Sequence, residues 1–208
     1  MKGELMSEAQ SSHVEIRCLW PPDFEAFRDH LLRLDPASRH DRLAGGVPDA
    51  FIVQYAEHCF GKGDLLYGTF VDGRMCGAAE LRSNQAIWSD QAPFGRHVHA
   101  EAAFSVEEAY RRRGIGEKLF QRIERAASNH GVETIEIVCL PDNVRMRSLA
   151  EKFKTSFTFQ QNALTGRPTA RRPTALSMVR EASSDLLDFG ASVFDARWRA
   201  LTESPKRG

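Results

Sequence analysis

The chain contains the stretch Val106-Glu-Glu-Ala-Tyr-Arg111-Arg-Arg-Gly114-Ile-Gly116, in which a strand-like segment leads through a cationic, glycine-containing turn into a helix. Glycine lets backbone N–H groups approach a bound anion closely, and the free N–H groups and positive dipole end of the following helix attract it. The guanidinium groups of Arg111, Arg112 and Arg113 can pair with phosphate oxygens. The stretch therefore predicts a phosphate-binding turn between a strand and a helix.

Two common nucleotide-binding motifs do not fit this turn. A Rossmann fingerprint requires a third glycine, and the corresponding position counted from Gly114 is Leu119. The Walker A pattern G-x-x-x-x-G-K-[ST] occurs nowhere in the sequence. The pattern that fits is Arg-x-x-Gly-x-Gly, from Arg111 to Gly116.

This pattern resembles the acetyl-CoA pyrophosphate loop of the GNAT superfamily of N-acetyltransferases, and the resemblance covers about residues 64 to 181. The segment 100–106 resembles the family's strand that separates from its neighbour and offers backbone groups to the pantetheine arm, with Val106 at the hydrophobic position. The segment from Asn143 to Lys152 resembles the N-x-x-M-x-x-L-A-x-K helix, whose Asn lies beside the cofactor. The resemblance implies acetyl-CoA as cosubstrate, bound by Phe104, Ser105, Val106, Arg111, Arg112, Arg113, Gly114, Ile115, Gly116 and Asn143.

Direct attack of an amine on the thioester needs a base but no enzyme nucleophile, and the sequence contains no G-x-S-x-G elbow. The run from Ala100 to Val106 is similar to bacterial protein lysine acetyltransferases, and this similarity implies Glu101 as the catalytic base. A carboxylate in a partly desolvated cleft suits the deprotonation of an ammonium group. The alternative for Glu101 is a solvent-facing or salt-bridged strand residue. His97 and His99 are rival bases.

The general acid is left open by the sequence. Many relatives place a tyrosine directly after the Leu of the Asn helix, but Ala150 stands there in this chain. Tyr110 is adjacent to the loop, although packing is the simpler interpretation of its position. Asn143 also has a second interpretation, as the N-cap of the helix that it begins.

The acceptor is expected to be a primary amine. The local similarity to lysine acetyltransferases implies a protein lysine, and a small amine or an antibiotic is the alternative. A noncatalytic acyl-CoA-binding sensory module is a hypothesis of another class, which the absent tyrosine permits. The arginine run also allows a polynucleotide binder, but 28 basic residues balance 28 acidic ones, so net charge gives this hypothesis no support.

Composition narrows the class of protein further. The four cysteines are widely separated and have no C-x-x-C pair, so no metal site is expected and buried free thiols are predicted. Because no secretory leader and no apolar run of about 18 residues is present, a soluble cytoplasmic protein without membrane or nucleic-acid partners is expected. A homodimer is possible because apolar residues crowd the C-terminal segment.

The hydrophobic patterns predict an α/β protein with a mixed, mostly antiparallel sheet of about six or seven strands flanked by helices. Expected strands occupy residues 14–20, 65–71, 75–81, 97–106, 134–140, 157–164 and 175–180, and Asp72-Gly73 is expected to form a hairpin turn. Expected helices begin near residues 22, 37, 49, 114, 143 and 183. The domain is predicted at 13–182, between a tail at 1–12 and a helical extension at 183–208; the helices of 22–61 and the loop 84–95 are expected to recognise the acceptor.

Overall fold

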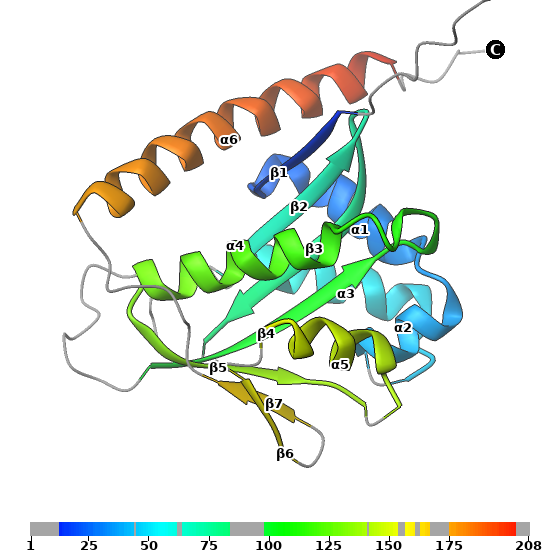
Figure 1. Cartoon of the computed structure of the whole chain (residues 1–208). Coiled ribbons are helices and arrows are strands. Elements are labelled where there is room, and N and C mark those ends of the chain that lie inside the picture. Colours follow the sequence, from blue (N-terminus) through cyan, green and yellow to red (C-terminus); the bar gives the residue numbers. More distant parts are fainter. Residues whose placement is uncertain are drawn as a thin grey trace, which may run out of the picture.

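The structure is a computed structural model and describes residues 13–43, 45–61, 64–83, 98–140, 142–153, 157–160, 163–166 and 175–202. In these residues a seven-stranded sheet has the order β1-β2-β3-β4-β5-β7-β6, with helices on both faces (Figure 1). The strands are β1 (Val14–Cys18), β2 (Leu65–Val71), β3 (Arg74–Arg82), β4 (Val98–Val106), β5 (Val132–Val138), β6 (Phe157–Gln160) and β7 (Ala163–Gly166). Only the β4–β5 pair is parallel among the strand pairs of the described residues, so the predicted mixed, mostly antiparallel sheet is confirmed.

The β2–β3 hairpin forms at the predicted Asp-Gly dipeptide. Asp72 and Gly73 have φ values of 50° and 78°, so both central residues of the turn are in the left-handed region. A two-residue hairpin of this kind matches the twist of its strands and favours Asn or Asp followed by Gly. The turn therefore fixes the register of β2 against β3.

Strands β4 and β5 are paired only over part of their length. Their register runs from Val98 opposite Val132 to Glu101 opposite Glu136, whereas β4 continues to Val106 and β5 to Val138. On its other edge β4 is paired with β3 up to Val106. The edge of β4 beyond Glu101 is therefore left without a partner strand in β5, and α5 (Val144–Glu151) lies beside it in Figure 1.

Two hydrophobic clusters lie on opposite faces of the sheet. One face is covered by α1 (Phe24–Leu32), α2 (Pro36–Leu43) and α3 (Asp49–Gly61), which follow the short 3-10 helix η1 (Pro21–Asp23). The other face is covered by α4 (Ile115–Asn129), which follows the second 3-10 helix η2 (Glu108–Tyr110), and the apolar stripe of α4 packs on β2 to β5 as predicted. Alternation along β4 turns Phe104 toward α4 and Ser105 toward α1, as their contacts show. All four cysteines are buried free thiols, as the sequence predicted.

The C-terminal part corrects two predictions. Residues 175–180, predicted as a strand, form the first turns of α6 (Ala175–Thr202), so this helix begins earlier than the predicted start at 183. The predicted strand 157–164 is interrupted and contributes to two strands, β6 and β7. The predicted division between residues 182 and 183 falls inside α6, and the predicted tail 1–12 lies outside the described residues. No helix of the described segments combines the length and apolar character needed to cross a bilayer.

Candidate cofactor site

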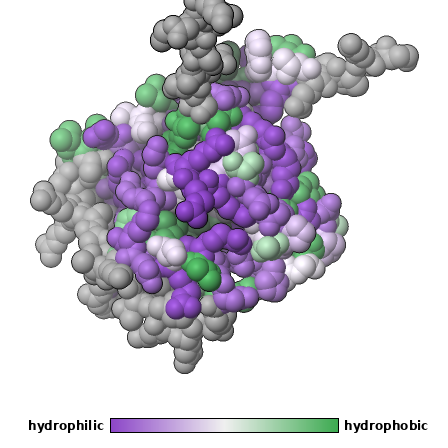
Figure 2. Space-filling model, turned by 45° about the vertical axis from the view of Figure 1, so that its right-hand side comes forward, coloured by the Kyte–Doolittle hydropathy of each residue, from purple (hydrophilic) through white to green (hydrophobic). Residues whose placement is uncertain are grey.

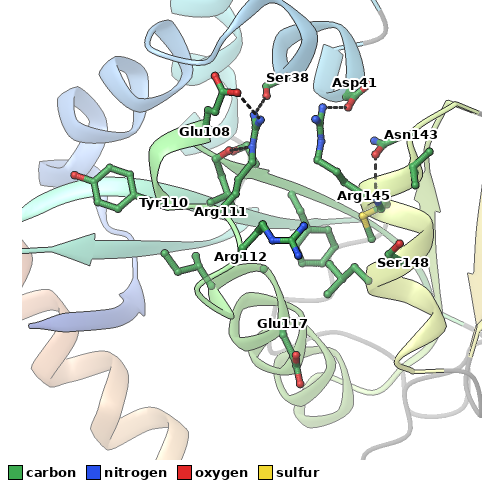
Figure 3. A pocket seen from close by; sticks show the side chains of 18 of the residues that line it. Ser38, Asp41, Glu108, Tyr110, Arg111, Arg112, Glu117, Asn143, Arg145 and Ser148 are labelled. Carbon is green, nitrogen blue, oxygen red and sulfur yellow. Dashed lines mark hydrogen bonds and ion pairs between the residues drawn. The ribbon is translucent and has the colours of Figure 1, made fainter. Parts of the chain in front are cut away.

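A cavity of about 910 Å³ opens where β4 ends and α4 begins. Its walls come from the end of β4, the following loop, the first turn of α4, helix α5 and helix α2 (Figure 3). Its size lies within the roughly 300–1,000 Å³ of small-molecule sites. It is lined by nine of the ten residues predicted to bind the cofactor: Phe104, Ser105, Val106, Arg111, Arg112, Gly114, Ile115, Gly116 and Asn143.

The loop has the backbone geometry of an anion cradle. Arg112 and Gly114 have φ values of 60° and 76°, so the chain turns sharply twice before α4 begins at Ile115. A left-handed conformation is uncommon for a residue other than glycine, which marks Arg112 as a constrained position. No side chain caps the N-terminus of α4 at Gly114. The first amide groups of α4 are therefore available to a ligand.

The side chain of Arg111 stabilises the loop from within the protein. Its guanidinium donates to the Val106 carbonyl oxygen at 3.2 Å, to Asp35 Oδ2 at 2.6 Å and to Ser38 Oγ. Burial opposes ionisation of Asp35, but hydrogen bonds from Ser38 and Arg111 lower the pKa of this carboxyl group to about 2. Arg111 thus joins the loop to the start of α2 and faces the cavity while its charge is paired.

The next two arginines take different positions. Figure 3 shows Arg112 extending from the loop toward α5, across the cavity. The guanidinium of Arg113 lies 5.3 Å from the centre of the Tyr110 ring, and Arg113 is not among the residues that line the cavity. Among these three arginines, Arg112 is the best placed for a phosphate oxygen.

Asn143 closes the cavity from the α5 side. Its Oδ1 atom accepts a hydrogen bond of 2.9 Å from the Met146 amide, so the N-cap interpretation of Asn143 is confirmed. Asn143 also lines the cavity. One side chain therefore stabilises the start of α5 and presents its remaining amide group to the site.

Glu101 lies at the last paired position of β4 and β5 and does not line the cavity. Its carboxylate accepts a hydrogen bond of 2.9 Å from Arg82 and is 46% exposed. The salt-bridged alternative of the sequence analysis is therefore present in the structure. His99 is exposed on the same strand, and His97 and the loop 84–95 lie outside the described residues.

Several polar residues of the cavity were not predicted from the sequence. Ser38, Asp41 and Arg42 reach it from α2, and Arg145 and Ser148 reach it from α5. Arg145 donates to Asp41 Oδ2 at 2.7 Å, which joins the two helices across the cavity. The described part of the face that comes forward in Figure 2 is largely hydrophilic. No local motif marks these residues, because helix packing brings them to the site.

The described residues contain no group of three or more His, Cys, Asp or Glu side chains arranged to hold a metal ion. The cavity instead combines free helix amides, one unpaired guanidinium and the free edge of β4. This combination suits an extended phosphate-containing ligand.

Comparisons with known proteins agree with this geometry. A model of the acetyltransferase (GNAT) family matches residues 19–154. The fold is similar to the GNAT domain of S. lividans PAT, with TM-score 0.57, 18% identity and coverage of 74% of this chain and 88% of that one. It is similar to RimL, a ribosomal L7/L12 alpha-N-protein acetyltransferase in complex with coenzyme A, with TM-score 0.57, 14% identity and coverage of 76% and 96%.

A third similar structure is a putative phosphinothricin N-acetyltransferase, with TM-score 0.59, 18% identity and coverage of 76% of this chain and all (100%) of that one. At these identities the similarity to solved structures shows the fold alone. The family is shown by the family model, which matches most of the chain. The chain belongs to the acetyltransferase (GNAT) family of acetyl-CoA-dependent N-acetyltransferases.

Proposed function

We propose that this protein transfers an acetyl group from acetyl-CoA to the primary amine of a protein lysine by direct attack. The observation that supports this most is the juxtaposition, in one cavity, of an uncapped helix N-terminus and a strand edge that loses its partner at Glu101. The first feature suits a diphosphate and the second suits the amide groups of a pantetheine arm. Acetyl-CoA carries both groups in sequence.

The residues present fit acetyl-CoA. The loop amides and Arg112 would hold its diphosphate, and the free edge of β4 from Phe104 to Val106 would hold its pantetheine arm. When bound, acetyl-CoA supplies the activated acyl group. The amide groups of β4 are fixed by the pairing with β3, so they are preorganised for a ligand.

Glu101 is the proposed base for the incoming ammonium group. It lies where β4 and β5 separate, and its exposed fraction of 46% allows it to pass a proton on to solvent. Arg82 keeps its carboxylate oriented at 2.9 Å. Glu101 acts directly or through one water molecule.

A protein lysine is proposed as the acceptor because the mouth of the cavity is polar and open. Asp41 and Arg145 lie there, and charged side chains of this kind suit a polar peptide. RimL, which shares the fold, is an alpha-N-protein acetyltransferase, whereas the third similar structure is named for phosphinothricin. A small amine is the alternative acceptor.

A CoA-release assay tests the proposal. Purified protein is incubated with acetyl-CoA and with lysine peptides, with small amines or without an acceptor, and free thiol is measured. We expect release to depend on the peptides, and Glu101→Gln to lower kcat by about 10²-fold or more near neutral pH. The matched control is Glu136→Gln, because Glu136 is exposed opposite Glu101 on β5.

Three results would overturn parts of the proposal. Release with small amines alone would replace the lysine acceptor by a small molecule. Tight binding of acetyl-CoA without release above background on any acceptor would indicate a noncatalytic acyl-CoA-binding module. Equal activity of Glu101→Gln and Glu136→Gln would remove Glu101 from the reaction.

A further inference from the structure

A buried hydrogen-bonded chain connects the cavity with the interior of the protein. Ser105 Oγ lies 2.9 Å from His30 Nε2, and His30 Nδ1 lies 3.1 Å from Glu107 Oε1. His30 is fully buried in α1, whereas Ser105 is 8% exposed and lines the cavity. The order hydroxyl, imidazole, carboxylate is the one that acyl-transfer enzymes use to move protons.

The partners of Glu107 determine the proton positions in this chain. Arg33 donates to Glu107 Oε1 at 2.9 Å and Arg74 donates to Oε2 at 3.1 Å, so the carboxylate is held as an acceptor. Burial opposes its ionisation, but hydrogen bonds from His30 and Arg33 lower the pKa of Glu107. His30 Nδ1 therefore carries a hydrogen that it donates to Glu107, and Nε2 is free to accept the Ser105 hydroxyl proton.

The proposed reaction needs a group that first accepts a proton from the acceptor nitrogen and then donates a proton to the sulfur. A protonated amine must lose two protons to become an amide: Glu101 takes the first one and passes it to solvent. The second proton leaves the acceptor nitrogen as the nitrogen–carbon bond forms, and a proton must reach the sulfur as the carbon–sulfur bond breaks. Ala150 stands where many relatives have a tyrosine, so this chain must supply the second transfer in another way.

We propose that Ser105 and His30 form the relay that carries this second proton from the acceptor nitrogen to the CoA sulfur, an inference that rests on the proposed function. As the nitrogen attacks, its N–H proton passes to Ser105 Oγ and the Ser105 hydroxyl proton passes to His30 Nε2. The reverse transfer delivers a proton through Ser105 to the departing sulfur. Amine and thioester become amide and thiol, and Ser105 and His30 return to their starting states.

The surroundings of His30 suit this role. Burial is the largest influence and lowers its pKa below the ordinary value of 6.5, the hydrogen bond and charge of Glu107 oppose this, and the charges of Arg33 and Arg42 add to it. His30 is therefore neutral at neutral pH and can accept a proton at Nε2. Its ion-pairing carboxylate stabilises the imidazolium that forms during transfer.

Substitution of Ser105 tests the relay without removing a large buried side chain. We expect Ser105→Ala to lower kcat by about 10²-fold or more, with an unchanged Kd for acetyl-CoA, and Ser105→Thr to restore a large part by keeping the hydroxyl group. The matched control is Ser128→Ala, because Ser128 on α4 has the same exposed fraction of 8% and does not line the cavity. We expect its kcat to stay within about twofold of the parent protein, as a conservative change remote from the chemistry.

The pH profile separates the relay from a structural role. Raising the pH supplies neutral amine, so it should restore activity to Glu101→Gln but not to Ser105→Ala. The parent protein should also show a solvent deuterium isotope effect on kcat that Ser105→Ala reduces. A Ser105→Ala protein with the activity and isotope effect of the parent would overturn the relay alone, whereas a parent protein that never releases CoA would overturn the proposed function.

A second and independent observation concerns the outward face of α6. Seven large apolar residues on this face are between 60% and 78% exposed: Leu176, Val179, Leu186, Leu187, Phe194, Trp198 and Leu201. Taking about 150 Å² for a fully exposed large side chain, they present roughly 700 Å² of apolar surface. A standard interface buries about 800 Å² per partner, so this face comes close to the area of a stable dimer.

The order of residues along α6 favours a second copy of the same helix. Apolar residues lie at equal distances on either side of Gly190: Leu186 matches Phe194, Leu187 matches Val193, and Val179 matches Leu201. The large Trp198 matches the small Ala182. Two antiparallel helices related by a two-fold axis at Gly190 would therefore place apolar residues opposite each other.

Gly190 fits the crossing point of such a pair. It is exposed in the middle of a 28-residue helix, and a Cβ atom there would meet nothing within 4 Å in the single chain. A glycine in a helix interior costs about 1 kcal/mol relative to alanine, and it permits close approach of another backbone. We infer that α6 pairs with α6 of a second copy around Gly190.

The mass of the full chain in solution tests this inference. Analytical ultracentrifugation should give a dimer for the parent protein, a monomer for Phe194→Glu, and a dimer for Phe51→Glu, since Phe51 is 44% exposed on α3 away from α6. A monomeric parent protein at about 100 µM would overturn the inference. A dimer that Phe194→Glu leaves intact would do the same.

Discussion

Helices α4 and α6 lie on the same side of the sheet (Figure 1). Apolar side chains attach α4 to the sheet, whereas polar side chains attach α6. Helix α4 buries Leu119, Ile123 and Ala126, each no more than 1% exposed, against the strands. Helix α6 turns its acidic residues inward and leaves Leu187 and Phe194 outside, at 75% and 66% exposure. The helix that follows the loop 111–114 is therefore part of the hydrophobic core, whereas α6 is held mainly by polar contacts.

The attachment of α6 centres on a buried cation. Arg17 is fully buried in β1, donates to both oxygens of Asp23 at 2.8 and 2.9 Å, and donates to Asp195 of α6 at 2.8 Å. Asp188 accepts a hydrogen bond of 2.8 Å from the Cys18 amide on the same strand. The comparison indicates that α6 depends on a few specific contacts, whereas α4 depends on an area of packing.

The largest expected effect comes from Arg17→Met. The change leaves Asp23 buried without its cation, which typically costs about 3–5 kcal/mol. We expect a loss of this size in the free energy of unfolding in urea, together with faster proteolysis within α6. Arg28→Met is the control: Arg28 pairs with Asp29 at 2.7 Å near the surface, and the loss of an exposed pair costs less than about 1 kcal/mol. Equal losses for the two variants would show that the buried cation does not hold α6.

The same substitution at two leucines compares the helices directly. Leu119→Ala on α4 empties a fully buried site and should cost about 2–5 kcal/mol of stability. Leu187→Ala on α6 removes an exposed side chain and should change the stability of a dissociated chain by no more than about 0.5 kcal/mol. The measurement is urea unfolding of both variants at a concentration where the protein is monomeric. A large loss for Leu187→Ala in that state would contradict the outward orientation of the apolar face.

Lowering the pH should stabilise the attachment of α6 to the sheet and destabilise the attachment of the loop 111–114 to Asp35. Burial raises the pKa values of Glu181, Asp185 and Asp188 on α6, so their contribution to stability is complete below about 4 and is lost as the pH rises through their raised values. Asp35, which pairs with Arg111 of the loop 111–114, has a lowered pKa of about 2, so its contribution is present above its ordinary 3.8 and is lost as the pH falls toward 2.

Hydrogen-exchange protection factors, corrected for the intrinsic pH dependence, measure both effects. Protection of α6 should rise as the pH falls from 7 toward 4, whereas protection of residues 108–114 should stay constant until the pH is below about 4. The buried half of α4 is the internal control. A fall in α6 protection over the same range would show that ion pairing with Arg17 and Arg122 outweighs burial.

The elements predicted correctly from sequence are those with local signals. The turn at Asp72-Gly73 requires positive φ at two successive residues, and the loop before Ile115 requires sharp turns that its glycines favour. The N-cap role of Asn143 follows from its position before a helical stripe. These features need no knowledge of distant residues, so the fold and the turn-to-helix geometry of the candidate site were predictable from sequence.

The features missed by the sequence analysis depend on contacts between distant segments. Residues 175–180 contain Leu176 and Met178 at alternate positions, which is the pattern of a strand, and the outward apolar face of α6 does not follow the usual helical rule. His30 reaches Ser105 from a helix 75 residues away in the chain. The charge of Arg111 is paired with Asp35, a contact that no motif specifies.

The smallest expected effect is at Gly190, and its sign depends on the state of the protein. In the single chain Gly190→Ala adds a Cβ atom that meets nothing within 4 Å, so the better helix propensity of alanine should stabilise the monomer by about 0.5–1 kcal/mol. In the inferred dimer the same methyl group lies at the crossing of two helices and should weaken association. Urea unfolding of monomer and dimer, at low and high protein concentration, measures both effects on one variant. Stabilisation at both concentrations would show that Gly190 is not a crossing point, because a helix surface that faces only solvent has no reason to penalise a methyl group.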